Sequence, residues 1–116
     1  MKILIKFTRL DSTPAITKYV ENKIGSVAKF MKRWDEGNTI EAQVELARRT
    51  YHHKKGDVFK AEVNLHLPGK MIRAVHNDTD IRKSIDRVRD ILKIEIGKYK
   101  ELRTGDRGSR RSQRRS

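Results

Sequence analysis

Apolar side chains recur along this chain with two different periods. In four segments they alternate with polar residues, which is typical of strands that bury one face; these segments are residues 2–8, 40–46, 59–67 and 70–76. Along residues 14–31 and 81–101 they recur every three or four positions, which indicates two amphipathic helices. The order β-α-β-β-β-α predicts an α+β fold, with a four-stranded mixed sheet and two helices packed on one face.

The starts of the helices and one hairpin turn are marked by residues that favour them. Thr13 and Pro14 stand where an N-cap and a first helical residue are expected, and residues 77–80 supply capping groups to the second helix. Pro68 and Gly69 predict a tight turn, since proline presets one dihedral and glycine accepts a positive φ. The first strand, helix and strand predict a right-handed crossover with the two strands parallel.

The end of the chain differs in composition from the rest. Residues 103–116 contain six arginines and one aspartate, and from Thr104 onward no apolar side chain is available to offset the entropy of ordering. We therefore predict one folded domain over residues 1–102 and a disordered, basic Arg/Ser-rich tail over residues 103–116.

The overall charge predicts a polyanionic partner, because the net charge is +13 and the pI is about 10.3. Cysteine is absent, which excludes disulfides, thiolate metal sites and cysteine nucleophiles. No apolar run approaches the roughly 18 residues of a membrane span, and the start is too short for a signal peptide, so a cytoplasmic location is expected. No nucleophile–base pair or phosphate-cradling glycine loop is visible, so we expect no enzyme, no small-molecule substrate and no cofactor.

Two histidines precede two lysines between the second and third strands. Because adjacent cations oppose a divalent ion and no thiolate is near, we predict no metal site at His52 and His53. The same loop, with Lys54 and Lys55, suits a hairpin tip that contacts phosphate.

The positive charge of the second helix falls along one edge of its apolar stripe and on its outer back. The edge residues are Arg82, Arg89, Lys93 and Lys100, and the back residues are Lys83, Arg87 and Lys98. The outward sheet positions are acidic or neutral by contrast; they are Glu41, Gln43, Glu45, Glu62 and Asn64. We therefore predict that the helix layer meets RNA and that the open sheet face does not.

Two residues break the local pattern. Lys23 projects into the apolar sector of the first helix, where it either leads its charge out to water or holds an ammonium between the helices, aimed at a phosphate. Ile94 is apolar on the basic back of the second helix, and we interpret it as a surface residue rather than a contact point.

Two common RNA-binding folds do not fit. An RRM-like reader stacks bases on aromatic residues of its sheet, whereas all three phenylalanines here are expected in the core. Residues 105–108 match a GXXG pattern, but they lie in the tail and do not join two helices, so no KH domain is predicted.

An ordered set of segments resembles the ribosome hibernation-promoting factors, the group that includes ribosome-associated inhibitor A (protein Y). The segments are Thr13–Ile16, Tyr19–Val20, Lys23, Val44–Leu46, His52–Gly56, Ala61–Leu65, Arg73–Ala74, Asp80 and Ile85–Asp86. No single segment is specific, but their order along roughly residues 1–101 is.

The resemblance implies a fold related in shape to double-stranded RNA-binding domains, and a short-form member of the family. It implies binding to 16S rRNA of the small ribosomal subunit, where the domain sterically blocks messenger RNA and the A- and P-site transfer RNAs during stress or stationary phase. The long form's dimerising domain is replaced by the tail, so we expect a monomer that does not pair ribosomes alone. Ile91 and Ile94 stand where the family often carries Lys and Arg.

Pattern and resemblance together give the candidate RNA-contacting residues. They are Lys23, Lys29, Lys54, Lys55, Arg73, Arg82, Lys83, Arg87, Arg89, Lys93, Lys98, Lys100, Arg110 and Arg111. Two alternatives stay open: a general double-stranded RNA-binding module, and a regulator that uses its basic face on an acidic protein.

Overall fold

The computed structural model describes residues 1–50 and 56–103, and it has the predicted order of elements. The strands are β1 (Lys2–Thr8), β2 (Glu41–Thr50), β3 (Asp57–Leu67) and β4 (Lys70–Asp78). The helices are α1 (Pro14–Gly25) and α2 (Ile81–Arg103), and two 3₁₀ turns, η1 (Ser26–Phe30) and η2 (Lys32–Trp34), follow α1.

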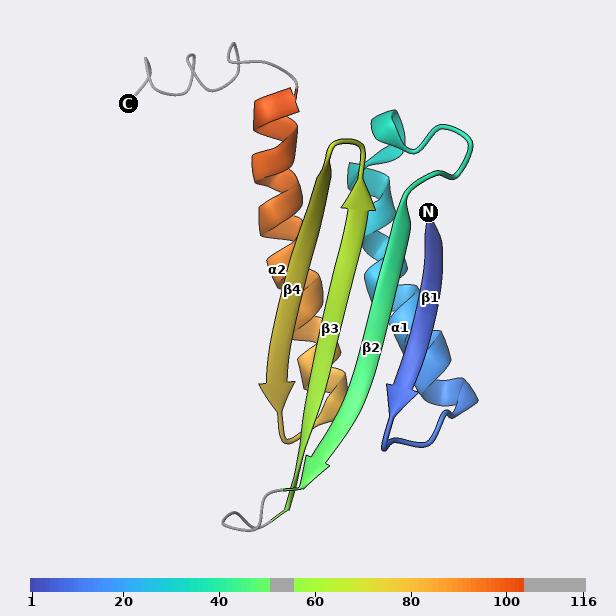
Figure 1. Ribbon diagram of the computed structural model, residues 1–116, viewed down its shortest axis with the longest axis vertical. Coiled ribbons are helices and arrows are strands. Elements are labelled where there is room, and N and C mark those ends of the chain that lie inside the picture. Colours follow the sequence, from blue (N-terminus) through green and yellow to red (C-terminus); the bar gives the residue numbers. More distant parts are fainter. Residues whose placement is uncertain (51–55, 104–116) are drawn as a thin grey trace, which may run out of the picture.

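The four strands form one sheet in the order β1-β2-β3-β4, with both helices on the same face (Figure 1). β1 and β2 are parallel, as predicted, and the other neighbouring strands are antiparallel. The predicted α+β fold is therefore confirmed. The helix layer and the open sheet face are two separate surfaces, so their charges can be compared directly.

The hydrophobic core lies between the sheet and the helices. Alternate residues of β2 to β4 and one stripe of α2 meet there; the largest fully buried side chains include Ile24, Met31, Leu46, Leu65, Ile85, Leu92 and Ile96. One buried hydroxyl is satisfied, because Ser84 Oγ donates a hydrogen bond of 2.7 Å to the Phe59 carbonyl oxygen. The polar and basic residues of both helices are consequently left on the outside.

The predicted caps and turn are present. Thr13 Oγ1 accepts a hydrogen bond of 3.2 Å from the Ile16 amide, and Asp80 Oδ1 accepts one of 2.9 Å from the Arg82 amide. Gly69 has a φ of +75°, which a residue with a side chain rarely adopts, and it closes the hairpin between β3 and β4.

The first helix is shorter than its hydrophobic period predicts. We expected it to run to Met31, but α1 ends at Gly25 and the chain continues as 3₁₀ turns. Ser26 Oγ donates to the Lys23 carbonyl oxygen at 2.6 Å, a local bond that competes with regular helix. Val27 and Met31 are buried all the same, because apolar spacings of three and four suit both helix types.

The hairpin formed by β2 and β3 is longer than predicted. β2 extends beyond Leu46 to Thr50, and β3 begins at Asp57 rather than Phe59. Thr50 Oγ1 donates to Asp57 Oδ1 at 2.8 Å where the two strands end. No helix in residues 1–50 and 56–103 is long and apolar enough to cross a membrane.

Candidate nucleic-acid interface

Basic side chains gather along the line where α1 and η1 pack against α2, and we call this line the groove. At one place along it, Tyr19 of α1 donates a hydrogen bond of 2.7 Å from its hydroxyl to Asp86 Oδ1 of α2. Lys23 Nζ lies 4.0 Å from the same oxygen. Lys23 Nζ and the Arg82 guanidinium carbon each lie 5.5 Å from the centroid of the Tyr19 ring, within cation–π distance. We call these four residues the Tyr19 cluster.

The hydroxyl of Tyr19 stays protonated at neutral pH. Burial raises its pKa above the ordinary value of 10.0, and its hydrogen bond to the negatively charged Asp86 raises it further. Arg82 and Arg89 oppose this shift through their positive charges. Tyr19 therefore acts as a neutral donor that ties α1 to α2 beneath the cations.

The ammonium of Lys23 lies in the crease between the helices. Its side chain is 35% exposed, so the charge is neither buried nor led far out into solvent. The sequence left two interpretations of Lys23 open, a charge led out to water and an ammonium held between the helices. The structure agrees with the second. Whether a phosphate binds there stays a prediction.

Further along the groove a small notch opens beside Phe30. Its lining residues are Phe30, Lys93, Ile96, Gly97 and Lys100, and its volume is about 130 Å³. Lys29 Nζ lies 5.3 Å and Lys93 Nζ 5.8 Å from the centroid of the Phe30 ring. We call this feature the Phe30 notch. It places an accessible aromatic ring among lysines.

The same combination recurs outside the groove, near the β3–β4 turn, where the Tyr99 hydroxyl donates a hydrogen bond of 2.9 Å to the Pro68 carbonyl oxygen. The rings of Trp34 and Tyr99 meet edge to face with centroids 5.4 Å apart. The Arg33 guanidinium lies 6.0 Å from the Trp34 ring, and that of Arg103 lies 5.6 Å from the Tyr99 ring. Aromatic side chains thus lie next to cations at three places on this side of the molecule.

The structure brings together one group of the predicted contact residues. Lys23 and Arg82 contact the Tyr19 ring, Arg89 is on the same edge of α2, and Lys29, Lys93 and Lys100 surround or line the Phe30 notch. These six residues are the groove cations. Arg89 also contacts its neighbour Asp90 at 3.1 Å. The predicted edge of α2 therefore does face α1.

Other predicted residues lie elsewhere. Lys83 and Arg87 are exposed on α2, as expected for its back. Lys98 pairs with Glu95 at 3.3 Å, and it lines a separate groove between α2 and β4 together with Arg73. The remaining four candidates lie outside the described residues; they are Lys54, Lys55, Arg110 and Arg111.

Arg73 is not part of the helix layer. It is on the open side of β4, where its guanidinium lies 3.3 Å from Glu62. The structure therefore separates Arg73 from the groove cations. RNA bound to the helix layer would not reach Arg73 through the same surface, so a contact with Arg73 requires a second RNA-binding surface.

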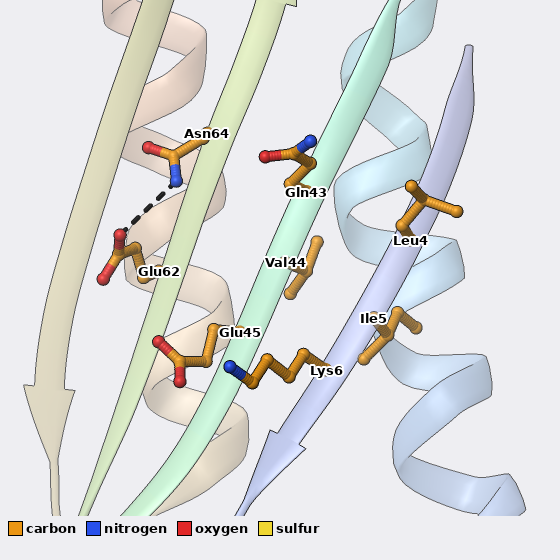
Figure 2. Close-up of a pocket in the computed structure, with 8 residues that line it drawn as sticks. All are labelled: Leu4, Ile5, Lys6, Gln43, Val44, Glu45, Glu62 and Asn64. Carbon is orange, nitrogen blue, oxygen red and sulfur yellow. Dashed lines mark hydrogen bonds between the residues drawn. The ribbon is translucent and has the colours of Figure 1, made fainter.

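The open sheet face carries a shallow hollow of about 360 Å³ (Figure 2). Glu45 and Glu62 are opposite each other in register, and Lys60 Nζ bridges them at 3.1 and 3.3 Å. The side chains of Lys6 and Glu45 point toward one another in Figure 2. The Thr8 hydroxyl and the Lys60 ammonium, both hydrogen-bonded to Glu45, lower the pKa of that carboxyl below its ordinary 4.5.

The prediction that this face is acidic or neutral needs a correction. Lys6, Lys60 and Arg73 also lie there, and they offset the carboxylates through cross-strand pairs. The sequence analysis named only the acidic and amide residues among the outward sheet positions, so it left Lys60 and Arg73 out of the charge of this face. Because Lys2 and Arg49 also alternate outward, basic side chains slightly outnumber the three glutamates of this face, whereas α2 carries eight basic and four acidic side chains.

Four residues of the groove were not identified from the sequence as functional candidates: Tyr19, Phe30, Asp86 and Gly97. Phe30 was expected in the core, but it is half-buried. Its flanking position on the helix and its neighbour Lys29 were the available signals. Within residues 1–50 and 56–103, no group of three or more metal-ligating side chains is present, and His52 and His53 lie outside that part.

Fold and groove together define an α+β domain with a basic helix layer suited to a polyanion. The chain belongs to the family described as "Sigma 54 modulation protein / S30EA ribosomal protein", whose model matches residues 3–104. This confirms the resemblance seen in the sequence.

Two curated relatives are named ribosome hibernation promotion factor. The one from Lactococcus lactis subsp. cremoris is 34% identical over 100 residues, covering 86% of this chain and 50% of the relative. The one from Picosynechococcus sp. is 30% identical over 105 residues, covering 90% and 52%. The chain thus spans about half the length of the curated relatives it matches.

Two solved structures share the fold. The N-terminal domain of protein Y from Thermus thermophilus matches with a TM-score of 0.63 and 28% identity, covering 85% of this chain and 99% of that one. A ribosomal subunit interface protein from Coxiella burnetii matches with a TM-score of 0.68, covering 86% and 98%. At 21% identity, the second likeness concerns the fold alone.

Proposed function

We propose that this domain is a ribosome hibernation factor that binds the small ribosomal subunit through the groove between α1 and α2. The groove cations bind phosphates of 16S rRNA, and the domain then occupies the space of messenger RNA and of the A- and P-site transfer RNAs. The observation that carries the proposal is the one-sided row of cations held on aromatic rings. The names of the relatives supply the ribosome as the partner.

Phosphate binding explains why the six groove cations lie together. An RNA backbone presents regularly spaced anions, and its affinity for a protein comes largely from exchanging counterions for lysine and arginine. Lys23 and Arg82 lie beside Tyr19 and Lys93 lies beside Phe30, so together they can contact several phosphates of one RNA. Cations held on rings also lose less conformational freedom on binding than free lysines do.

Inhibition by this route needs no chemical step. A bound domain excludes the substrates of the decoding region by volume, so no catalytic group is required. This agrees with the family, whose relatives are named as ribosomal proteins and hibernation factors rather than enzymes. Such a role also agrees with the expected cytoplasmic location.

The proposal is tested by co-sedimentation with purified small subunits, with and without transfer RNA in the A and P sites. We expect the protein to pellet with empty subunits and to be displaced from occupied ones. The double variant Lys23→Glu/Lys93→Glu should stay in the supernatant.

A matched control is Lys2→Glu/Lys18→Glu, which changes the net charge equally at two exposed positions. Lys18 is five residues before Lys23, which is about 140° around the helix axis and away from the groove. The control variant should pellet like the wild type. If both variants lose binding alike, charge alone drives association and the groove has no special part.

The same experiment separates the two alternatives. A general double-stranded RNA module would bind empty and occupied subunits equally, and it would be displaced by a plain RNA duplex. A regulator with an acidic protein partner would keep that partner after ribonuclease treatment.

A further inference from the structure

Gly97 lies within α2 without a packing reason for glycine. A Cβ built there meets no heavy atom within 4 Å, and the residue is not among those with a positive φ. Glycine weakens a helix interior relative to alanine, because it loses more conformational freedom on folding. The fold alone would therefore favour alanine at this position.

The missing side chain leaves the Phe30 notch open. Gly97 lies between Lys93 and Lys100 on the groove side of α2, and Phe30 and Ile96 complete the apolar lining. At about 30 Å³ per water molecule, the 130 Å³ of the notch corresponds to roughly four waters. That space suits one planar heterocycle, but not a helix or a strand.

The charges around the notch indicate what kind of heterocycle fits. Lys29 and Lys93 hold their ammonium groups within 6 Å of the Phe30 ring centroid, and Lys100 lines the same notch. A ligand with an aromatic ring and anions on either side of it satisfies both features. Unpaired nucleotides have this composition, and proteins commonly bind them by stacking the base on an aromatic side chain.

We infer that the Phe30 notch accepts one unpaired nucleobase, while the lysines around it bind the adjoining phosphates. The inference rests on the proposed function, in that RNA is the ligand, and it adds base contact to phosphate contact. A base-paired helix cannot use the notch, because its bases are stacked on one another. The notch thus favours RNA segments with an extruded or single-stranded base.

The test compares two single-stranded RNA oligomers of twelve nucleotides, one of adenosines and one in which the central positions are abasic. Both carry the same phosphates, so they differ only in the bases offered. The wild type should bind the adenosine oligomer about tenfold more tightly, which is at the lower end of base–aromatic stacking. Equal binding of the two oligomers, including no measurable binding of either, would overturn the inference.

Variants at Gly97 and Phe30 locate the effect. Gly97→Ala should raise the thermal midpoint and lower the preference for the adenosine oligomer, because its Cβ occupies open space in the notch. Gly97→Leu and Phe30→Leu should abolish the preference. Phe30→Leu should also weaken binding of both oligomers, because Lys29 and Lys93 lose the ring that holds them. A preference that survives in Gly97→Leu would place the base elsewhere.

A phosphate-contact control distinguishes this inference from the proposed function. Lys93→Gln should weaken binding of both oligomers. If Gly97→Leu loses base preference but the wild type does not bind small subunits, the proposed function fails and the notch stands. If subunits are bound and Gly97→Leu behaves as the wild type on both oligomers, the notch fails and the proposed function stands.

Discussion

The proposed binding to small subunits should depend on salt according to the number of groove cations that bind phosphate. The six cations are Lys23, Lys29, Arg82, Arg89, Lys93 and Lys100. Each neutralised phosphate contributes about 0.7 to 0.9 to the slope of log affinity against log salt, the lower value being for single strands. If all six bind phosphate, a fourfold rise in salt should lower the affinity about 300- to 1,800-fold.

Removing one cation should change this slope by a defined amount. Lys93→Gln takes away one phosphate contact, so its slope should be shallower by about 0.7 to 0.9. Over the same fourfold rise in salt, the variant should lose about threefold less affinity than the wild type. Lys18→Gln removes the same charge outside the groove and should leave the slope unchanged.

The assay is fluorescence anisotropy of labelled protein titrated with purified small subunits, at fixed magnesium and several potassium concentrations. A wild-type slope of about two or less would mean that most groove cations do not bind phosphate. Equal slopes for Lys93→Gln and Lys18→Gln would refute the assignment of Lys93 to the interface, whatever the absolute affinities are.

Three further predictions concern stability and the tail. Ser84→Ala leaves a β3 carbonyl without its side-chain partner and should lower the free energy of unfolding by about 1–2 kcal/mol in urea titrations, while Ser12→Ala should not. Because Thr8 and Lys60 lower the pKa of Glu45, its contribution is present above pH 4.5 and is lost as the pH falls through the folded-state pKa. Glu45→Gln should therefore lose less stability than the wild type on acidification, and an equal loss would contradict this. Deleting residues 104–116 should weaken subunit binding in the anisotropy assay without abolishing it, since the groove remains.

The parts of the fold that depend on local chemistry were predictable from the sequence. Alternation gave the strands, Thr13 and Asp80 act as caps, and Gly69 takes the positive φ of the turn. The end of α1 was not predictable in this way. Val27 fits an α-helix and a 3₁₀ helix equally well, and the hydrogen bond that favours the second comes from the hydroxyl of Ser26.

The part of the site that lies on a single helix was predictable from the sequence. Helical geometry correctly placed Arg82 and Lys93 on one edge of α2, because that projection needs only 100° per residue. It could not show that Tyr19 and Asp86 meet, since they are 67 residues apart and come together through packing. The notch beside Gly97 was missed for the same reason, because an empty space has no sequence signal of its own.

The acidic residues of the helix layer make sense only with the contacts in view. Asp86 stands among cations that should bind phosphate, which by itself would repel RNA. It accepts the Tyr19 hydrogen bond and lies 4.0 Å from Lys23, so it helps to hold the ring and the ammonium in place. Partly exposed ion pairs such as this contribute about 0–1 kcal/mol, so a phosphate can replace Asp86 as the partner of Lys23 at small cost. Under the proposed function, the acid orders Tyr19 and Lys23 in the free protein and is replaced by a phosphate when RNA binds.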